Sequence, residues 1–220
     1  TKMVATAGGL DIFLAYQPVG PNAARLATLA KRYPAIRFST IVDNRGTVSE
    51  LSAACVAAGV RLPVLLDVNC GMNRTGIVPG PEAIAVYRAL ASAPGLEAGG
   101  LHAYDGHLHE PDAAKLKSAA DAAFATVAQL RDQLVAAGLP VPRMVAGGTP
   151  TTPLHAHRSG FDIEVGAGTT VLWDAGQPTV CPDQHFLHAA VLLMRVVSKP
   201  TPNRLCFDLG HKAVASEMPL

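Results

Sequence analysis

The chain of 220 residues carries 18 lysines and arginines against 17 aspartates and glutamates, and 49% of its residues are hydrophobic. This composition allows a sizeable buried core and excludes an intrinsically disordered chain, and the net charge of +1 without a basic block argues against nucleic-acid binding. No apolar run reaches the roughly 18 residues that span a bilayer, so we expect a cytoplasmic protein without a membrane segment.

Short apolar runs bounded by Gly, Pro or Asp recur along the first three quarters of the chain. Their continuous apolar character favours strands of a parallel sheet that is covered on both faces, rather than half-exposed antiparallel strands. The predicted strands are residues 11–16, 36–42, 64–68, 99–104, 143–146, 161–165 and 169–172.

Between these runs lie Ala- and Leu-rich stretches with apolar residues at helical spacing, namely residues 23–31, 48–58, 81–91 and 113–137. Pro81 suits a first helical turn, and Gly59 and Gly138 suit helix C-caps. Strand–helix units of roughly 25–30 residues predict an α/β fold, a (β/α)8 TIM barrel that lacks its first unit. A doubly wound open sheet is the alternative, but the Gly-x-Gly-x-x-Gly turn that it favours after its first strand is absent.

The texture of the sequence changes after Trp173, where loop-like residues replace the strand–helix alternation. Residues 189–198 and 203–208 are predicted to be two strands around a turn at 199–202. We therefore expect residues 1–175 to form the partial barrel and residues 186–220 to begin a β-rich second domain.

Two Gly- and Thr-rich loops, at residues 146–152 and 164–170, are associated with predicted strands. Consecutive glycines allow a close backbone approach, and turn amides with a Thr hydroxyl form a set of donors for an anion. One such loop alone is better explained as an ordinary turn. In a barrel, however, both loops would lie side by side at the carboxyl ends of strands, where barrel phosphate sites occur. Together they favour a ligand that carries a phosphate group.

A third loop, at residues 67–76, follows a predicted strand and contains Arg74. The planar guanidinium group suits a carboxylate, a phenolate oxygen or a phosphate. A surface arginine that closes a turn is the alternative, which the surrounding Gly and Asn residues weaken because they indicate a tight and specific backbone.

A fourth segment, at residues 102–109, places Tyr104 and His107 at a strand end, and we consider them as ring contacts at an active site or as part of a polar surface loop. The alternating histidines suggest a metal site, but no neighbouring set of ligands completes one. The remaining histidines outside this segment are expected to be exposed or to support other residues; these include His155, His157, His185 and His188.

Five motifs occur in an order that is far more specific than each motif alone. They are residues 67–76, 104–107, 147–151, 166–169 with Trp173 and Asp174, and 208–217. This set resembles the D-threonine aldolase / D-serine dehydratase family, the metal-activated branch of the alanine-racemase-like, fold type III pyridoxal-phosphate enzymes. The resemblance spans about residues 11–217 and implies an N-terminal barrel of the alanine racemase type followed by a β domain.

The resemblance implies that pyridoxal 5'-phosphate is held at the carboxyl end of the barrel. Arg74, with Thr75, would lie near its phenolic oxygen, and Tyr104 would lie beside its ring. Tyr104 and His107 are the candidate catalytic residues of this chain. The other implied cofactor-binding residues are Gly147, Gly148, Thr149, Gly166, Gly168 and Thr169.

Three departures from the family pattern stand out. The lysine that anchors the cofactor belongs to a Pro-His-x-Lys context in the first barrel strand; Lys2 lacks that context, so we expect the lysine upstream of Thr1. The metal ligands of the family, a His-x-Cys or His-x-Asp pair, are expected beyond Leu220, and His211 is not that pair. Gly166 stands where racemase relatives have the arginine that contacts the pyridine nitrogen.

The resemblance implies a lyase that splits D-threonine into glycine and acetaldehyde, activated by a divalent metal (Mn, Zn or Mg) in the full-length protein and acting as a homodimer. The alternative within the family is a D-serine dehydratase, which forms pyruvate and ammonia. A non-catalytic pyridoxal-phosphate-binding barrel and a barrel enzyme for a phosphorylated metabolite are alternatives of other classes.

Overall fold

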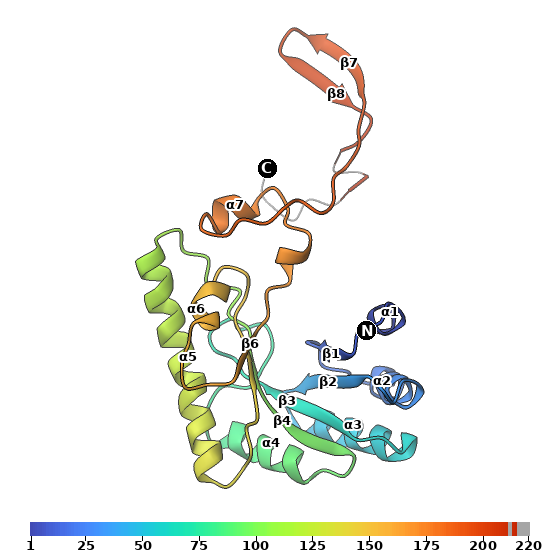
Figure 1. Cartoon of the computed structure of the whole chain (residues 1–220), viewed down its shortest axis with the longest axis vertical. Coiled ribbons are helices and arrows are strands. Elements are labelled where there is room, and N and C mark those ends of the chain that lie inside the picture. Colours follow the sequence, from blue (N-terminus) through green and yellow to red (C-terminus); the bar gives the residue numbers. More distant parts are fainter. Residues whose placement is uncertain (211–212, 215–220) are drawn as a thin grey trace. The chain divides into compact units, whose positions relative to one another are not determined.

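The computed structural model describes residues 1–210 and 213–214, and the chain forms two compact units, Thr1–Ala167 and Gly168–Leu220 (Figure 1). Much of the predicted motif at residues 208–217, including His211, lies outside the described residues. Among the described helices, none is long and apolar enough to cross a membrane.

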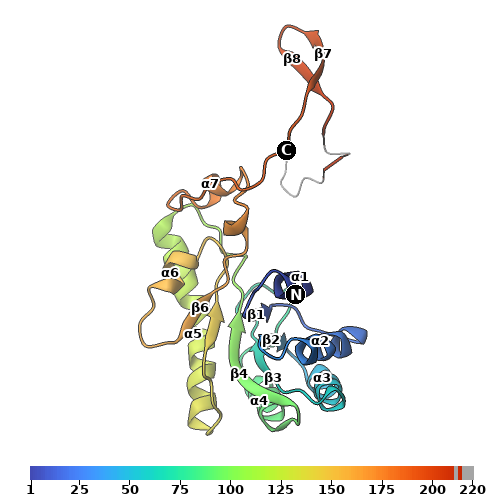
Figure 2. The ribbon, with the colours of Figure 1, turned by 45° about the vertical axis from the view of Figure 1, so that its right-hand side comes forward.

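Six parallel strands form one sheet in the first unit, in the sequential order β1-β2-β3-β4-β5-β6 (Figures 1 and 2). A sequential order is that of a TIM barrel, whereas a doubly wound sheet reverses its order at a switch point. The prediction of a partial (β/α) barrel is therefore confirmed. The strands are β1 (Asp11–Leu14), β2 (Arg37–Val42), β3 (Leu62–Asp67), β4 (Leu96–Ala103), β5 (Met144–Ala146) and β6 (Ile163–Val165).

The four long helices predicted from periodicity are present, and two helices of five residues each, too short to repeat an apolar pattern, were not predicted. Asn44 caps the second long helix by accepting a hydrogen bond from the Thr47 amide, and Gly59 ends that helix in the left-handed conformation. Pro81 occupies a first-turn position as predicted. The helices are α1 (Lys2–Thr6), α2 (Pro21–Arg32), α3 (Arg45–Ala58), α4 (Pro81–Ser92), α5 (Ala113–Ala136) and α6 (Thr152–Ala156).

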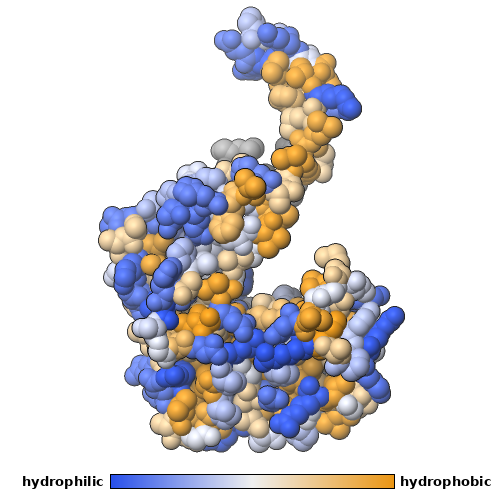
Figure 3. Space-filling model, viewed as in Figure 1, coloured by the Kyte–Doolittle hydropathy of each residue, from blue (hydrophilic) through white to orange (hydrophobic). Residues whose placement is uncertain are grey.

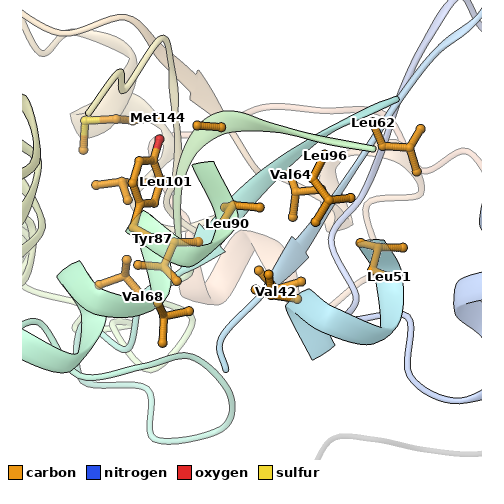
Figure 4. Packing of buried hydrophobic residues seen from close by; sticks show 14 of the residues in the cluster. Val42, Leu51, Leu62, Val64, Val68, Tyr87, Leu90, Leu96, Leu101 and Met144 are labelled. Carbon is orange, nitrogen blue, oxygen red and sulfur yellow. The ribbon is translucent and has the colours of Figure 1, made fainter. Parts of the chain in front are cut away.

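The main core lies between the helices and one face of the sheet (Figure 4). Alternate residues of β3, such as Val64, belong to this core together with Leu51 of α3 and Leu90 of α4, and all three side chains are fully buried. The opposite face of the sheet carries a smaller apolar cluster of Ile41, Leu65 and Val145, together with Phe13. We call the first the helix-covered face and the second the inner face.

The inner face also carries buried polar pairs. The Asp67 carboxylate lies 2.6 Å from Nδ1 of His102, and these residues are register partners at the carboxyl ends of β3 and β4. Arg143, at the start of β5, donates to Ser39 at 2.8 Å and to Glu164 at 2.8 Å. Charged side chains this deeply buried need such partners.

The second unit corrects three predictions. Residues 169–172, predicted to be a strand, contain the short 3-10 helix η1 (Thr169–Val171), and the short helix α7 (Gln177–Val180) follows. The predicted strand at residues 189–198 begins only at β7 (Val196–Thr201), which pairs with β8 (Arg204–Phe207). The turn falls at Pro202 and Asn203 rather than at 199–202.

Local hydrogen bonds explain these differences. The Trp173 amide bonds to the Thr169 carbonyl at 2.8 Å, which closes a helical turn that apolar content alone does not reveal. The segment before β7 is extended without strand pairing, and its side chains are exposed, as the hydrophobic surface in Figure 3 shows. The apolar residues at 189–195 therefore predicted a strand, but no strand of the described residues pairs with them.

Candidate functional site

Three predicted motifs of the first unit follow strands β3, β4 and β5. Because these strands are parallel neighbours, their carboxyl ends meet at one edge of the sheet. The loops at residues 67–76 and 104–107 and the turn at residues 147–151 are therefore brought together from segments far apart in the sequence.

The loop that carries Arg74 is held in a fixed shape by two side chains. Oδ1 of Asn69 accepts hydrogen bonds from the amides of Gly71 (3.0 Å) and Asn73 (3.1 Å), and Asn73 adopts a left-handed conformation with φ of 54°. Asp43, from the end of the neighbouring strand β2, accepts from the Gly76 amide at 3.1 Å. The loop is thus anchored at its start and its end.

The Arg74 guanidinium group lies over the Tyr104 ring, 4.5 Å from the ring centroid. Within the described part of the chain, no carboxylate pairs with Arg74, and its side chain is exposed. A cation stacked on an aromatic face, with no internal counter-ion, is well suited to meet an anionic oxygen of a ligand. The structure thus places Arg74 beside Tyr104, and the contact of either residue with a cofactor stays a prediction. Thr75, the next residue, is also exposed.

The Tyr104 ring occupies space that only glycine leaves open. A Cβ atom at Gly106 would lie 2.2 Å from the Tyr104 hydroxyl oxygen, and one at Gly148 would lie 3.2 Å from Cε2 of the ring. The ring therefore packs between the 104–107 segment and the 147–151 turn, and its direction is set by both.

His107 packs over the Arg74 loop. A Cβ at Gly71, where φ is 124°, would lie 2.9 Å from Nε2 of His107. Nδ1 of His107 is buried and has no hydrogen-bond partner among the described residues. A buried polar atom without a partner is costly, so it marks a place where a ligand or a water would bind.

The 147–151 turn is built tightly against the rest of the site. Gly147, with φ of 86°, donates its amide to Ala103 at 3.0 Å, and a Cβ there would lie 2.6 Å from the His155 ring. The Gly166 amide bonds to Ala146 at 3.2 Å, and a Cβ at Gly166 would lie 3.1 Å from the Gly147 carbonyl oxygen. Glycine at 147 is thus required by backbone conformation and by packing.

A buried carboxylate that sequence reasoning missed supports this turn. Oδ1 of Asp105 accepts hydrogen bonds from the Gly148 amide (2.6 Å) and the Thr151 hydroxyl (2.7 Å), and Oδ2 lies 2.8 Å from Nε2 of His155. His155 is buried, so of the two expectations for it exposure is wrong, and its contact with Asp105 fits the support of other residues. The sequence shows that Asp105 follows Tyr104, but it gives no sign that Asp105 pairs with His155, fifty positions later.

The other predicted residues have different surroundings. Thr149 is buried within the turn. His157 is exposed and bonds to the Pro153 carbonyl at 2.7 Å. Gly168 and Thr169 belong to the second unit, where Gly168 precedes η1, so their contribution to this site stays a prediction. In the same unit His188 bonds to the Trp173 carbonyl, and His185 is exposed.

The residues of the first unit fit an aromatic ligand with anionic groups. Arg74 offers a cation, Tyr104 offers an aromatic surface, and His107 offers a buried nitrogen without a partner. One donor differs from expectation, because the Gly148 amide is already bonded to Asp105.

The described residues contain no group of three or more His, Cys, Asp or Glu side chains that could hold a metal ion. Cys70, which contacts the Tyr104 carbonyl, lies in the Arg74 loop, and its burial, aided by nearby carboxylates, raises the pKa of its thiol to about 11. A thiol in this state is a poor metal ligand and nucleophile at neutral pH.

Comparison with known proteins bears on both fold and family. Residues 16–172 match the model of the alanine racemase N-terminal domain. The chain is 32% identical to the D-threonine aldolase of an Arthrobacter species over 218 residues, which cover 96% of this chain and 56% of that protein. It is 30% identical to the 3-hydroxy-D-aspartate aldolase of Paracoccus denitrificans over 197 residues, 86% of this chain and 50% of that protein.

A solved structure agrees with these relatives. The D-threonine aldolase from Filomicrobium marinum superposes with a TM-score of 0.88 at 28% identity, over 96% of this chain and 57% of that one. The chain thus spans about half the length of the relatives it matches. The resemblance noted in the five motifs is confirmed, and the chain belongs to the alanine racemase N-terminal domain family.

Proposed function

We propose that this chain is the cofactor-binding part of a pyridoxal-phosphate-dependent lyase that acts on D-β-hydroxy amino acids in the manner of a D-threonine aldolase. The observation that carries the proposal is the convergence of the Arg74 loop, Tyr104 and the 147–151 turn at one sheet edge. The similarity to two aldolases along most of the chain supports the same assignment.

Different residues of the site would hold different parts of the cofactor. Arg74 would face the phenolic oxygen, the Tyr104 ring would lie against the pyridine ring, and Thr149 in its turn would bind the phosphate. Gly168 and Thr169 would add to the phosphate site, and Gly166 would leave the pyridine nitrogen without an arginine. When bound, pyridoxal phosphate supplies an electron sink for cleavage of a bond at the amino acid's α-carbon.

Which bond of the α-carbon is cleaved depends on how the amino acid is oriented against the cofactor's pyridine ring. This chain would contribute by holding that ring in a fixed orientation. Arg74 and Tyr104 together restrict both the position and the tilt of a ring stacked on them, because cation and aromatic face are mutually fixed at 4.5 Å. His107, with its buried Nδ1, would meet a polar group of the cofactor or substrate. The described residues provide no set of ligands for a metal ion, so the roles given to them here involve none.

Cleavage between Cα and Cβ of D-threonine yields glycine and acetaldehyde, and 3-hydroxy-D-aspartate yields glycine and glyoxylate. A dehydratase would instead eliminate the β-hydroxyl group as water, and hydrolysis of the resulting imine would take up one water, so that ammonia and a 2-oxo acid are the net products. We favour the aldolase because the two relatives named above, which are 32% and 30% identical over 96% and 86% of this chain, carry that name. We further propose a homodimer in the cytoplasm, a barrel over residues 1–175 and a second domain that begins near residue 186.

The test uses the full-length protein. Pyridoxal phosphate is added to cofactor-free protein, and the cofactor absorbance that stays with the protein after gel filtration is measured. D-Threonine, 3-hydroxy-D-aspartate and D-serine are then supplied with a manganese or zinc salt, and aldehyde, 2-oxo acid and ammonia are assayed. L-Threonine is the matched control for stereochemistry.

We expect retained cofactor and aldehyde with D-threonine or 3-hydroxy-D-aspartate, but not with L-threonine. A 2-oxo acid with ammonia would replace the aldolase by the dehydratase. Cofactor binding without turnover of any substrate would favour the non-catalytic barrel. Absence of cofactor binding would reject both pyridoxal-phosphate readings and leave a barrel for another phosphorylated ligand.

A further inference from the structure

Asp105 is the centre of a buried hydrogen-bonded chain behind the 147–151 turn. Asp105 is 2% exposed, and its carboxylate has three partners within 2.8 Å: the Gly148 amide, the Thr151 hydroxyl and Nε2 of His155. Thr151 and His155 are themselves buried, at 0% and 3% exposure. All three partners come from the turn and from the short helix α6 that follows it.

The other nitrogen of His155 determines which atom carries the proton. Nε of Arg158 lies 3.1 Å from Nδ1 of His155, and a guanidinium nitrogen can only donate. Nδ1 is therefore the acceptor, and Nε2 carries the proton that it donates to Asp105. Every hydrogen bond in the chain from Arg158 through His155 to Asp105 runs in one direction.

This series of hydrogen-bonded side chains continues to helix α5. Arg158 forms an ion pair with Asp121 at 2.8 Å, and its guanidinium group lies 4.4 Å from the centre of the Phe124 ring. The turn is thus tied through three side chains to the longest helix of the molecule, which gives it a rigid support.

This arrangement assigns the Gly148 amide to the protein rather than to a ligand. Transfer of that amide to a phosphate would leave the buried carboxylate short of a donor, which is costly. The ligand must therefore use other groups of the turn, whose positions depend on how firmly Asp105 holds Gly148 and Thr151.

We propose that Asp105 is a positioning residue: it holds the 147–151 turn in the shape that receives the cofactor's phosphate, and His155 and Arg158 keep its carboxylate in place. This inference rests on the proposed function, since the phosphate belongs to the proposed cofactor. It concerns affinity for the phosphate group, and not the chemistry at the amino acid.

The fixed direction of the hydrogen bonds provides a specific test. In Asp105→Asn, the amide NH2 would face the Nε2 proton of His155. If His155 changed tautomer to accept that NH2, its Nδ1 proton would face the Arg158 donor. With either tautomer of His155, two N–H donors therefore face each other, one way towards residue 105 and the other way towards Arg158. Arg158→Gln removes the conflict, because a glutamine amide can donate or accept.

The experiment compares the dissociation constants of pyridoxal phosphate and of pyridoxal, which lacks the phosphate, for the full-length protein and three variants. The variants are Asp105→Asn, Arg158→Gln and the double variant. We expect Asp105→Asn to weaken pyridoxal phosphate binding by about tenfold or more, with a change of less than about threefold for pyridoxal. The double variant should return to within about threefold of Arg158→Gln alone.

Unchanged pyridoxal phosphate affinity in Asp105→Asn, an equal loss for pyridoxal, or a double variant no better than Asp105→Asn would each overturn the positioning role. Should Asp105→Asn not fold, Thr151→Val removes one donor to Asp105 and is expected to show the same selective loss, more weakly; an unselective effect there also overturns the role. Wild-type protein that binds no pyridoxal phosphate would reject the proposed function itself, whereas a binding wild type with an unaffected Asp105→Asn rejects the positioning role alone.

Discussion

The two faces of the six-stranded sheet differ in what they bury. The helix-covered face is largely apolar, as Val64 and Leu66 of β3 and Leu101 of β4 illustrate. The inner face is apolar only near its middle, around Leu65, and becomes polar at the carboxyl ends of the strands, where Asp67 and His102 pair.

The difference separates stability from function along the same strands. Side chains of a strand alternate between faces, so β3 contributes to the core with every second residue and to the inner face with the others. The loops that follow β3, β4 and β5 extend from the polar edge. We therefore expect substitutions on the helix-covered face to unfold the protein and those at the polar edge to affect ligand binding.

The largest effect is expected for Leu90→Ala on α4. Leu90 is fully buried, so its truncation should lower the free energy of unfolding by about 2–5 kcal/mol. Urea unfolding followed by circular dichroism measures it. Val135→Ala on α5 is the matched control, because Val135 is 52% exposed; equal losses in both variants would contradict the placement of the core.

Arg74→Met tests the polar edge. Loss of a charged donor to an anionic oxygen should weaken pyridoxal phosphate binding by about 1.5–3 kcal/mol and leave the free energy of unfolding of cofactor-free protein within about 0.5 kcal/mol. Fluorescence titration with the cofactor gives the first quantity. Arg61→Met, at the opposite end of β3, should leave affinity unchanged, and an equal loss there would mean that Arg74 acts only through overall charge.

Thr149→Val is expected to act more weakly. Removal of one hydroxyl from the proposed phosphate contacts should cost about 0.5–1.5 kcal/mol of cofactor affinity. Equilibrium dialysis against pyridoxal phosphate measures it, with Thr126→Val on the exposed face of α5 as control. Retention equal to that of the control would remove Thr149 from the site.

The smallest effect is expected on the surface of α5. The Lys117 ammonium group, with Arg158, lowers the pKa of the Asp121 carboxyl, and the two side chains are 2.5 Å apart. A lowered pKa stabilises the fold above the ordinary carboxyl pKa, and this contribution disappears as pH falls through the lowered value. Lys117→Met should therefore raise the pKa of Asp121, seen by NMR titration, and cost about 0.3–0.5 kcal/mol at neutral pH but not in strong acid. A cost that persists in acid would point to lost packing.

Prediction from sequence succeeded where the signal was local or periodic. The apolar runs that became β1 to β6 and the periodic stretches that became α2 to α5 are each long enough to reveal their type. It failed at residues 169–172 and 189–195, where apolar residues do not form the predicted strands. The described part of the chain shows no strand pairing there, and pairing is a tertiary property.

The same division holds for the site. The sequence by itself determined the strand–helix order, the positions of the Gly-rich turns and the presence of Arg74 and Tyr104 at strand ends, because these depend on neighbouring residues. Only the tertiary structure decided that Arg74 stacks on Tyr104 and that Asp105 occupies the Gly148 amide. Those contacts join residues 30 and 43 positions apart, and parallel strands bring such residues together only when the sheet has formed.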